Sequence, residues 1–162
     1  MARIEDLPVP WTLSRKRIVE CARSYIGVPY LHQGRSRRSG VDCSGLIALM
    51  CNDLGVPFED KKGGYSSQPH SDLLIAPCEK CAWKPDDQRT VIPGDIVVFW
   101  GPNPREPQHF GIIAPGHGVG GISLVHSFSK YGRVLEHGWN AWFSKHYWGR
   151  YLFPGTADGG FV

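Results

Sequence analysis

The chain of 162 residues lacks any long apolar run, which excludes a membrane-spanning helix. No stretch approaches the roughly 18 consecutive apolar residues that such a helix needs. Residues 1–17 contain prolines but no apolar segment of signal-peptide length. The sequence therefore predicts a soluble protein without an export signal, made in the cytoplasm and not inserted into a membrane.

A strong charge of one sign is also missing, as are nucleotide-binding motifs. The formal net charge is only +3, which suits an anionic partner such as a bacterial cell wall but is equally common in proteins without one. No phosphate-cradling glycine loop or dinucleotide fingerprint is present. We expect no nucleic-acid partner and no cofactor.

The chain has five cysteines, an odd number, so they cannot all pair in disulfides within one chain. We expect them to stay reduced, as in a protein folded in the cytoplasm. Cys78 and Cys81 have the spacing of half a zinc site, but no second ligand pair is evident. The sequence favours loop cysteines and no metal, with zinc as the alternative.

The patterns that are present predict one α+β domain over residues 1–162, with its core at about 14–153. Helical periodicity covers 14–26, with Ser14 as N-cap, and 43–54. Gly- and Pro-rich turns then separate five segments with strand character. These segments are 96–100, 109–114, 122–128, 133–136 and 148–153. Helices first and a run of strands second predict N-terminal helices packed on an antiparallel meander.

Cys43 stands at the predicted start of the second helix. Backbone N–H groups at a helix start point outward, and the helix dipole adds positive potential there. This field stabilises a thiolate, the nucleophilic form of cysteine. The neighbouring Asp42 carboxylate opposes the effect, so the helix field and an imidazolium must outweigh it, or Asp42 must turn away to bind substrate.

Two of the seven histidines share a predicted sheet face. A hairpin symmetric about His117 and Gly118 places His109 directly opposite His126, with Cβ atoms about 4.5–5.5 Å apart. Gly111 then leaves room beside His109 for a helix start. A cysteine nucleophile needs a base, and the base needs a third group to orient it. We predict His109 as the base and His126 as the orienting residue.

Several blocks of sequence resemble the NlpC/P60 cysteine peptidases, in the right order over about 14–153. The blocks are Gly27-Val28-Pro29-Tyr30, Val41-Asp42-Cys43-Ser44-Gly45-Leu46, Pro93-Gly94-Asp95-Ile96-Val97, His109-Phe110-Gly111-Ile112 and Val125-His126-Ser127. The segment 29–35 is most similar to the phage-tail and gene-transfer-agent branch. The resemblance implies a papain-like fold and cleavage of peptide-stem amides in bacterial peptidoglycan. It also implies phage or phage-like tail proteins as partners, which would carry the enzyme to the periplasmic wall in a virion.

The same resemblance implies roles for individual residues. Cys43 matches the family nucleophile, His109 the base and His126 the third polar position. Tyr30 matches a tyrosine that assists with the oxyanion or substrate, and Asp42 and Ser44 match residues lining the substrate pocket. Two alternatives stay open: a catalytically silent structural protein of a tail tip, and a Cys–His amidase or acyltransferase acting on another amide or a lipid.

Overall fold

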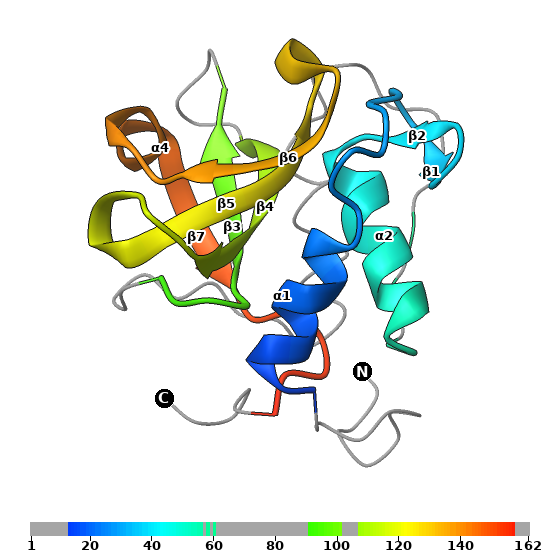
Figure 1. The fold of residues 1–162 in the computed structure, drawn as a ribbon, viewed down its shortest axis with the longest axis horizontal. Coiled ribbons are helices and arrows are strands. Elements are labelled where there is room, and N and C mark those ends of the chain that lie inside the picture. Colours follow the sequence, from blue (N-terminus) through cyan, green and yellow to red (C-terminus); the bar gives the residue numbers. More distant parts are fainter. Residues whose placement is uncertain (1–12, 57, 59, 61–90, 102–106, 158–162) are drawn as a thin grey trace.

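A computed structural model of the chain describes residues 13–56, 58, 60, 91–101 and 107–157. It shows an antiparallel sheet of five strands with helices against both faces (Figure 1). A hairpin of β1 (Arg35–Ser36) and β2 (Gly40–Val41) precedes the second helix. Cys78 and Cys81 lie outside the described residues.

The two predicted N-terminal helices are present. Helix α1 spans Arg15–Arg23, and its N-cap is Ser14, whose Oγ accepts a hydrogen bond from the Arg17 N–H at 3.2 Å. It is shorter than predicted because residues 24–26 turn through i→i−3 bonds before Gly27, which has a φ of 96°. Helix α2 spans Cys43–Asp53. No helix built from the described residues is long and apolar enough to cross a bilayer.

The sheet confirms the α+β prediction. Its strands, in the order β6-β5-β4-β3-β7, are all antiparallel. Strands β3 to β6 form the predicted meander, whereas β7 returns to pair with β3 at the opposite edge. The strands are β3 (Ile96–Trp100), β4 (Pro107–Pro115), β5 (Ile122–Phe128), β6 (Arg133–Gly138) and β7 (Tyr147–Tyr151).

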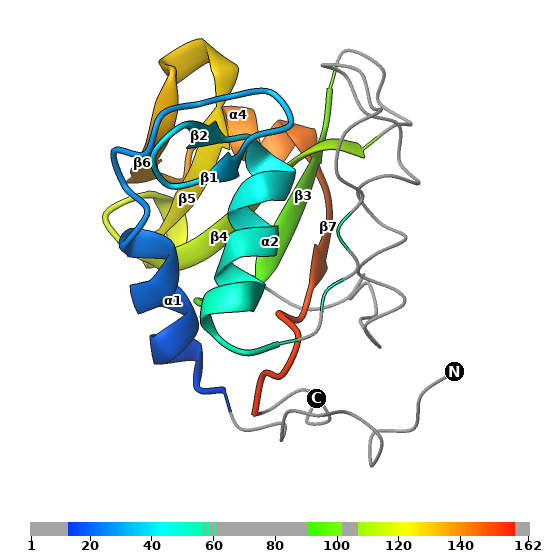
Figure 2. The ribbon, with the colours of Figure 1, turned by 90° about the vertical axis from the view of Figure 1, so that its right-hand side faces the viewer.

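Strand alternation divides the interior into two cores, one on each side of the sheet. On one side α1 and α2 cover alternate residues of the strands, including Phe110, Ile112 and Val125. On the other side lies α4 (Ala141–His146), a short helix that the sequence patterns did not predict. Figure 2 shows α2 in front of the sheet and α4 behind it. Phe143 of α4 packs there with Phe99 of β3.

The predicted register of the β4–β5 hairpin is wrong by two residues. Ile113 pairs with Leu124 instead of Ile122. The reason is the turn, in which a 3₁₀ segment, Val119–Gly121, shifts the centre of the hairpin toward its second strand. Because side chains alternate with a period of two, a two-residue shift keeps every side chain on its predicted face. His109 and His126 therefore stay on one face as diagonal neighbours.

A buried ionic cluster ties α1 to the sheet. The Asp95 side chain, just before β3, is fully buried, and its carboxylate lies 2.7 Å from Nη1 of Arg15 and 3.1 Å from Nη1 of Arg150. It also accepts a hydrogen bond from the Ile92 N–H at 2.9 Å. Arg150, on β7, is itself only 1 % exposed. The cluster thus links the first helix, the start of β3 and an edge strand.

Candidate active site

Asp42 is the N-cap of α2, and both of its carboxylate oxygens accept hydrogen bonds from backbone N–H groups. Its Oδ1 accepts from the Gly45 N–H at 2.7 Å, and its Oδ2 accepts from the Gln33 N–H at 2.8 Å. Nη1 of Arg35 lies 3.1 Å from Oδ1. With 4 % of its surface exposed, Asp42 fixes the helix start and the preceding loop. This geometry gives no support to the predicted role of Asp42 in the substrate pocket.

The Cys43 sulfur meets strand β4 at its backbone. The N–H groups of Phe110 and Ser44 are hydrogen-bonded to the sulfur, and Phe110 directly follows His109. Among the described residues, the structure has no hydrogen bond between this sulfur and the His109 ring. Hydrogen bonds between catalytic groups are often long before substrate binds. The start of α2 nevertheless contacts β4 at the residue next to His109.

The surroundings of the Cys43 sulfur favour the neutral thiol over the thiolate. Burial raises the pKa of the Cys43 thiol to about 12, and the Asp42 carboxylate acts in the same direction. The backbone N–H groups and Arg35 lower the pKa without offsetting burial. Burial is the largest of these effects, and its size could not be predicted from the sequence.

Three histidine rings form a continuous chain on the α4 side of the sheet. Nε2 of His109 lies 2.6 Å from Nδ1 of His126, as the predicted pairing of these rings requires. Nε2 of His126 in turn lies 2.6 Å from Nε2 of His137. Nδ1 of His109 makes no hydrogen bond within the described residues. Sequence reasoning missed the link to His137, because the predicted strand ended at 136.

Aromatic side chains pack against this row of histidines, and burial disfavours a charge on its two inner rings. Phe128 lies 4.8 Å from His109 between ring centroids, and Phe143 lies 5.9 Å from His126. Burial lowers the pKa of His109 and of His126 well below the usual value, and the neighbouring imidazoles lower each further. A neutral His109 can accept a proton, as a general base must.

The remaining predicted site residues surround the helix start. Tyr30 is half-buried, and its pKa is raised by burial first and then by the charges of Cys43 and Asp42. Ser44 is also half-buried and directs its backbone N–H at the sulfur. Gly111 does not leave room for α2 as predicted. A Cβ there would lie 2.3 Å from Cδ1 of Leu124 and 3.3 Å from Cβ of His126.

One positioning contact could not be predicted from the sequence. The buried Ser127 hydroxyl donates a hydrogen bond to the carbonyl of Val41 at 2.6 Å. Ser127 follows His126, and Val41 lies two residues before Cys43. This bond joins the nucleophile's segment to the histidine strand across 86 residues of chain.

Residues 27–152 match the model of the NlpC/P60 family. The chain belongs to the NlpC/P60 family. It is 32% identical over 97 residues to the gamma-DL-glutamyl hydrolase of Bacillus subtilis, covering 60% of this chain and 20% of that protein. It is 26% identical over 130 residues to the probable endopeptidase NlpC of Escherichia coli, covering 78% of this chain and 70% of that protein. The chain thus spans a fifth of the first relative.

Solved NlpC/P60 structures share the fold. The NlpC/P60 domain of the peptidoglycan hydrolase SagA superposes with a TM-score of 0.57 at 24% identity, covering 85% of this chain and 97% of that domain. An NlpC/P60 family protein from Bacillus cereus superposes with a TM-score of 0.61 at 19% identity, covering 92% of this chain and 42% of that one. These likenesses confirm the papain-like NlpC/P60 fold.

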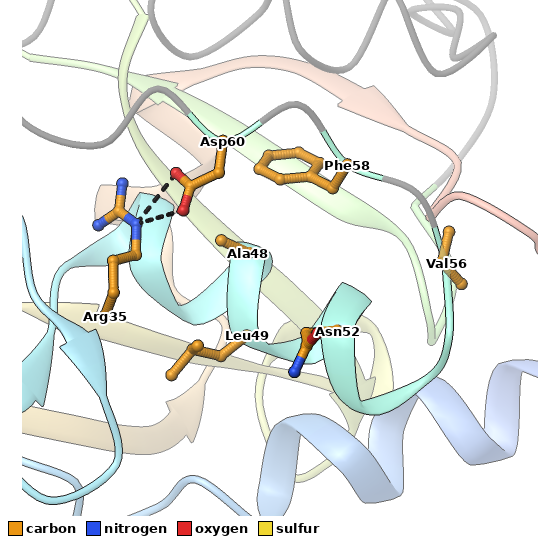
Figure 3. Close-up of a pocket in the computed structure, with 7 residues that line it drawn as sticks. All are labelled: Arg35, Ala48, Leu49, Asn52, Val56, Phe58 and Asp60. Atoms are coloured by element: carbon orange, nitrogen blue, oxygen red, sulfur yellow. Dashed lines mark hydrogen bonds and ion pairs between the residues drawn. The ribbon is translucent and has the colours of Figure 1, made fainter.

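A hollow on the outer side of α2 is separate from the predicted catalytic residues (Figure 3). Its wall includes Asp60, which pairs with Nε of Arg35 at 2.9 Å. Arg35 therefore bridges Asp42 and Asp60 and contributes to the loop before α2. No group of three or more acidic, cysteine or histidine side chains among the described residues is placed to hold a metal ion.

Gly45 in this NlpC/P60 chain has a packing role that predicts a sharp effect. A Cβ at Gly45 would lie 2.1 Å from the Gly34 carbonyl oxygen, so Gly45→Ala must displace the start of α2. We expect a loss of about 1–3 kcal/mol in the free energy of unfolding, measured in urea. Hydrolytic activity should also fall, because the start of α2 carries Cys43. Gly149→Ala, where a Cβ meets nothing within 4 Å, should change neither; equal losses in both variants would contradict the assignment.

The buried histidines predict a specific loss of stability in acid. Their folded pKa values are lowered, so the unfolded chain binds more protons below about pH 6.5, and stability falls as the pH falls. Each buried ring contributes a slope of up to about 1.4 kcal/mol per pH unit. In urea titrations from pH 7 to 4, His126→Gln should show a shallower slope than the wild type. His117→Gln, at an exposed turn position, should keep the wild-type slope.

Proposed function

We propose that this protein is a cysteine peptidase that hydrolyses amide bonds in the peptide stems of bacterial peptidoglycan. The observation that carries the proposal is the position of the Cys43 sulfur against the Phe110 N–H, one residue from His109. His109 is bonded on its other side to His126, which supplies the orienting group that such a base needs. The names of the relatives support the substrate class, since they include a glutamyl hydrolase and a probable endopeptidase.

In the proposed mechanism, the Cys43 thiol gives its proton to Nδ1 of His109 as the sulfur attacks the amide carbon. Because burial keeps the thiol neutral at rest, proton transfer accompanies attack. The oxyanion is held by the Cys43 N–H and the Tyr30 hydroxyl, and Ser44 lines the pocket. His109 then protonates the leaving amine nitrogen. A water molecule, deprotonated by His109, hydrolyses the thioester and restores the thiol.

Digestion of purified sacculi tests this function. Wild-type protein should release soluble muropeptide fragments, and mass spectrometry of the products should identify one stem amide as the cleaved bond. Sacculi that stay intact at every pH from 5 to 9 would contradict the proposal and favour a silent structural protein. Cleavage of a lipid or other amide in place of peptidoglycan would favour the amidase or acyltransferase alternative.

We also propose that the enzyme is a component of a phage or phage-like tail. Support comes from the sequence of residues 29–35, which resembles the phage-tail and gene-transfer-agent branch. The test is quantitative mass spectrometry of purified particles from the source bacterium. A fixed copy number in each particle supports the proposal, and absence from particles contradicts it while leaving the peptidase function untouched.

A further inference from the structure

His137 of β6 has no role in the mechanism above, yet it completes the chain of imidazoles. Its Nε2 lies 2.6 Å from Nε2 of His126, and the two rings are inclined by only 16°. Nearly parallel rings whose nitrogens approach this closely can share one N–H···N hydrogen bond. His137 is half-buried, whereas His126 is 1 % and His109 is 8 % exposed, so His137 is the outer end of the chain.

Each of the two nitrogen–nitrogen contacts needs one proton, which couples the three tautomers. When neutral His137 carries its proton on Nδ1, its Nε2 accepts from the Nε2–H of His126. Nδ1 of His126 then accepts from the Nε2–H of His109, and Nδ1 of His109 keeps a free lone pair. This is the arrangement in which His109 can take a proton from Cys43.

We propose that His137 is a positioning residue that fixes the tautomer of His109 and whose protonation sets the acid limit of activity. The proposal rests on the proposed function of Cys43 and His109. A doubly protonated His137 must donate to Nε2 of His126, which moves the proton of His126 to Nδ1. Nδ1 of His126 then donates to Nε2 of His109, and the proton of His109 moves to Nδ1. A proton at the outer ring thus blocks the base at the inner one.

The three histidine rings also carry positive charge outward during attack. The Cys43 proton bonds to Nδ1 of His109, the Nε2 proton of His109 moves to Nδ1 of His126, and the Nε2 proton of His126 moves to Nε2 of His137. His109 and His126 end neutral, and His137 ends as the imidazolium. The transfers reverse when His109 protonates the leaving amine. Placing the charge on the outer ring avoids an imidazolium in the buried part of the site.

His137 is the ring of the three that can take up a proton from solvent, because it is only half-buried. Among the described residues, the titratable groups facing it are His126 from β5 and Tyr131 from the adjoining turn, with ring centroids at 4.7 and 5.5 Å. Lys130 lies 5.7 Å from the Tyr131 ring, and α4 presents the apolar Phe143. Burial lowers the pKa of His137, and it does so while leaving the ring partly exposed.

The test compares His137→Phe and His137→Gln with the wild type on a purified soluble muropeptide, measuring kcat and KM from pH 4 to 8. In both variants the positive charge must reside on a buried ring, so the acid limb of the kcat/KM profile should move down by about one pH unit or more. Glutamine can accept from the Nε2–H of His126, whereas phenylalanine cannot. We expect kcat to fall about tenfold or more in His137→Phe and clearly less in His137→Gln, with KM unchanged.

An acid limb that stays at the wild-type pH in both variants overturns the proposal, and so does an equal kcat in the two variants. A merely structural residue would change stability without moving the limb, so circular dichroism is recorded at each pH. Imidazole ¹⁵N NMR of the substrate-free wild type provides a readout without activity. A protonless Nδ1 on His109 at pH 8 supports the proposal, and a protonated one overturns it even if the peptidase function fails its own test.

Discussion

Replacing Cys43 by alanine is expected to abolish hydrolysis of purified sacculi. The variant loses the sulfur atom that forms the thioester in the proposed mechanism, so neither His109 nor the oxyanion donors can compensate. Removing the nucleophile of a comparable hydrolase lowers kcat by about four orders of magnitude or more. Mass spectrometry of the released muropeptides measures the effect, and only background release should remain.

A matched control separates loss of chemistry from loss of structure. Cys51 lies on the same helix and is also buried, at 1 % exposure. Cys51→Ala removes a sulfur from the same core without touching the site, so it should keep most of the wild-type activity. Undiminished hydrolysis by Cys43→Ala would refute the mechanism, whereas equal inactivation of both variants would attribute the loss to the packing of α2.

The largest expected loss of stability belongs to Asp95→Asn. This change removes the buried negative charge that pairs with both Arg15 and the buried Arg150 guanidinium. Breaking a buried ion pair by removing one partner costs about 3–5 kcal/mol. The free energy of unfolding in urea at pH 7 should fall by this amount.

The control for Asp95 is an exposed pair on the same helix as Arg15. Glu20→Gln interrupts the contact with Lys16, whose Nζ lies 3.9 Å from the Glu20 carboxylate. Exposed pairs of this kind contribute about 0.3–0.5 kcal/mol, so the urea midpoint should barely move. A similar small effect for Asp95→Asn would show that the buried cluster does not stabilise the fold.

The elements that could be predicted from the sequence are those with strong periodicity and clear ends. The apolar run Ile96–Trp100 is observed as β3 with the predicted bounds, and the strand predicted at 122–128 is β5. Ser14 caps α1 as expected. The sequence does not reveal helix α4, because its six residues are too few for a helical period to emerge.

The shared sheet face of the two predicted histidines could be derived from the sequence, but the contacts of the candidate site could not. Side-chain alternation is enough to place His109 and His126 on one face, and it survives the error in register. The thiol pKa was not predictable, because it depends on how deeply the Cys43 sulfur is buried. The capping role of Asp42 was equally hidden, because partners such as Gln33 come from a loop whose path the sequence does not reveal.

The turn between β4 and β5 lies at the end of the hairpin opposite to His109 and His126, which bears on how the protein can be joined to other molecules. In Figure 1 this turn is at the lower left, whereas α2 begins at the upper right. Gly120 and Gly121 lie at its tip and are exposed, and a Cβ added at either position would meet no atom within 4 Å. Exposed turns of this kind accept inserted sequence most readily. A dye, an affinity tag or a carrier domain attached between these glycines would leave Cys43 and the candidate active site uncovered.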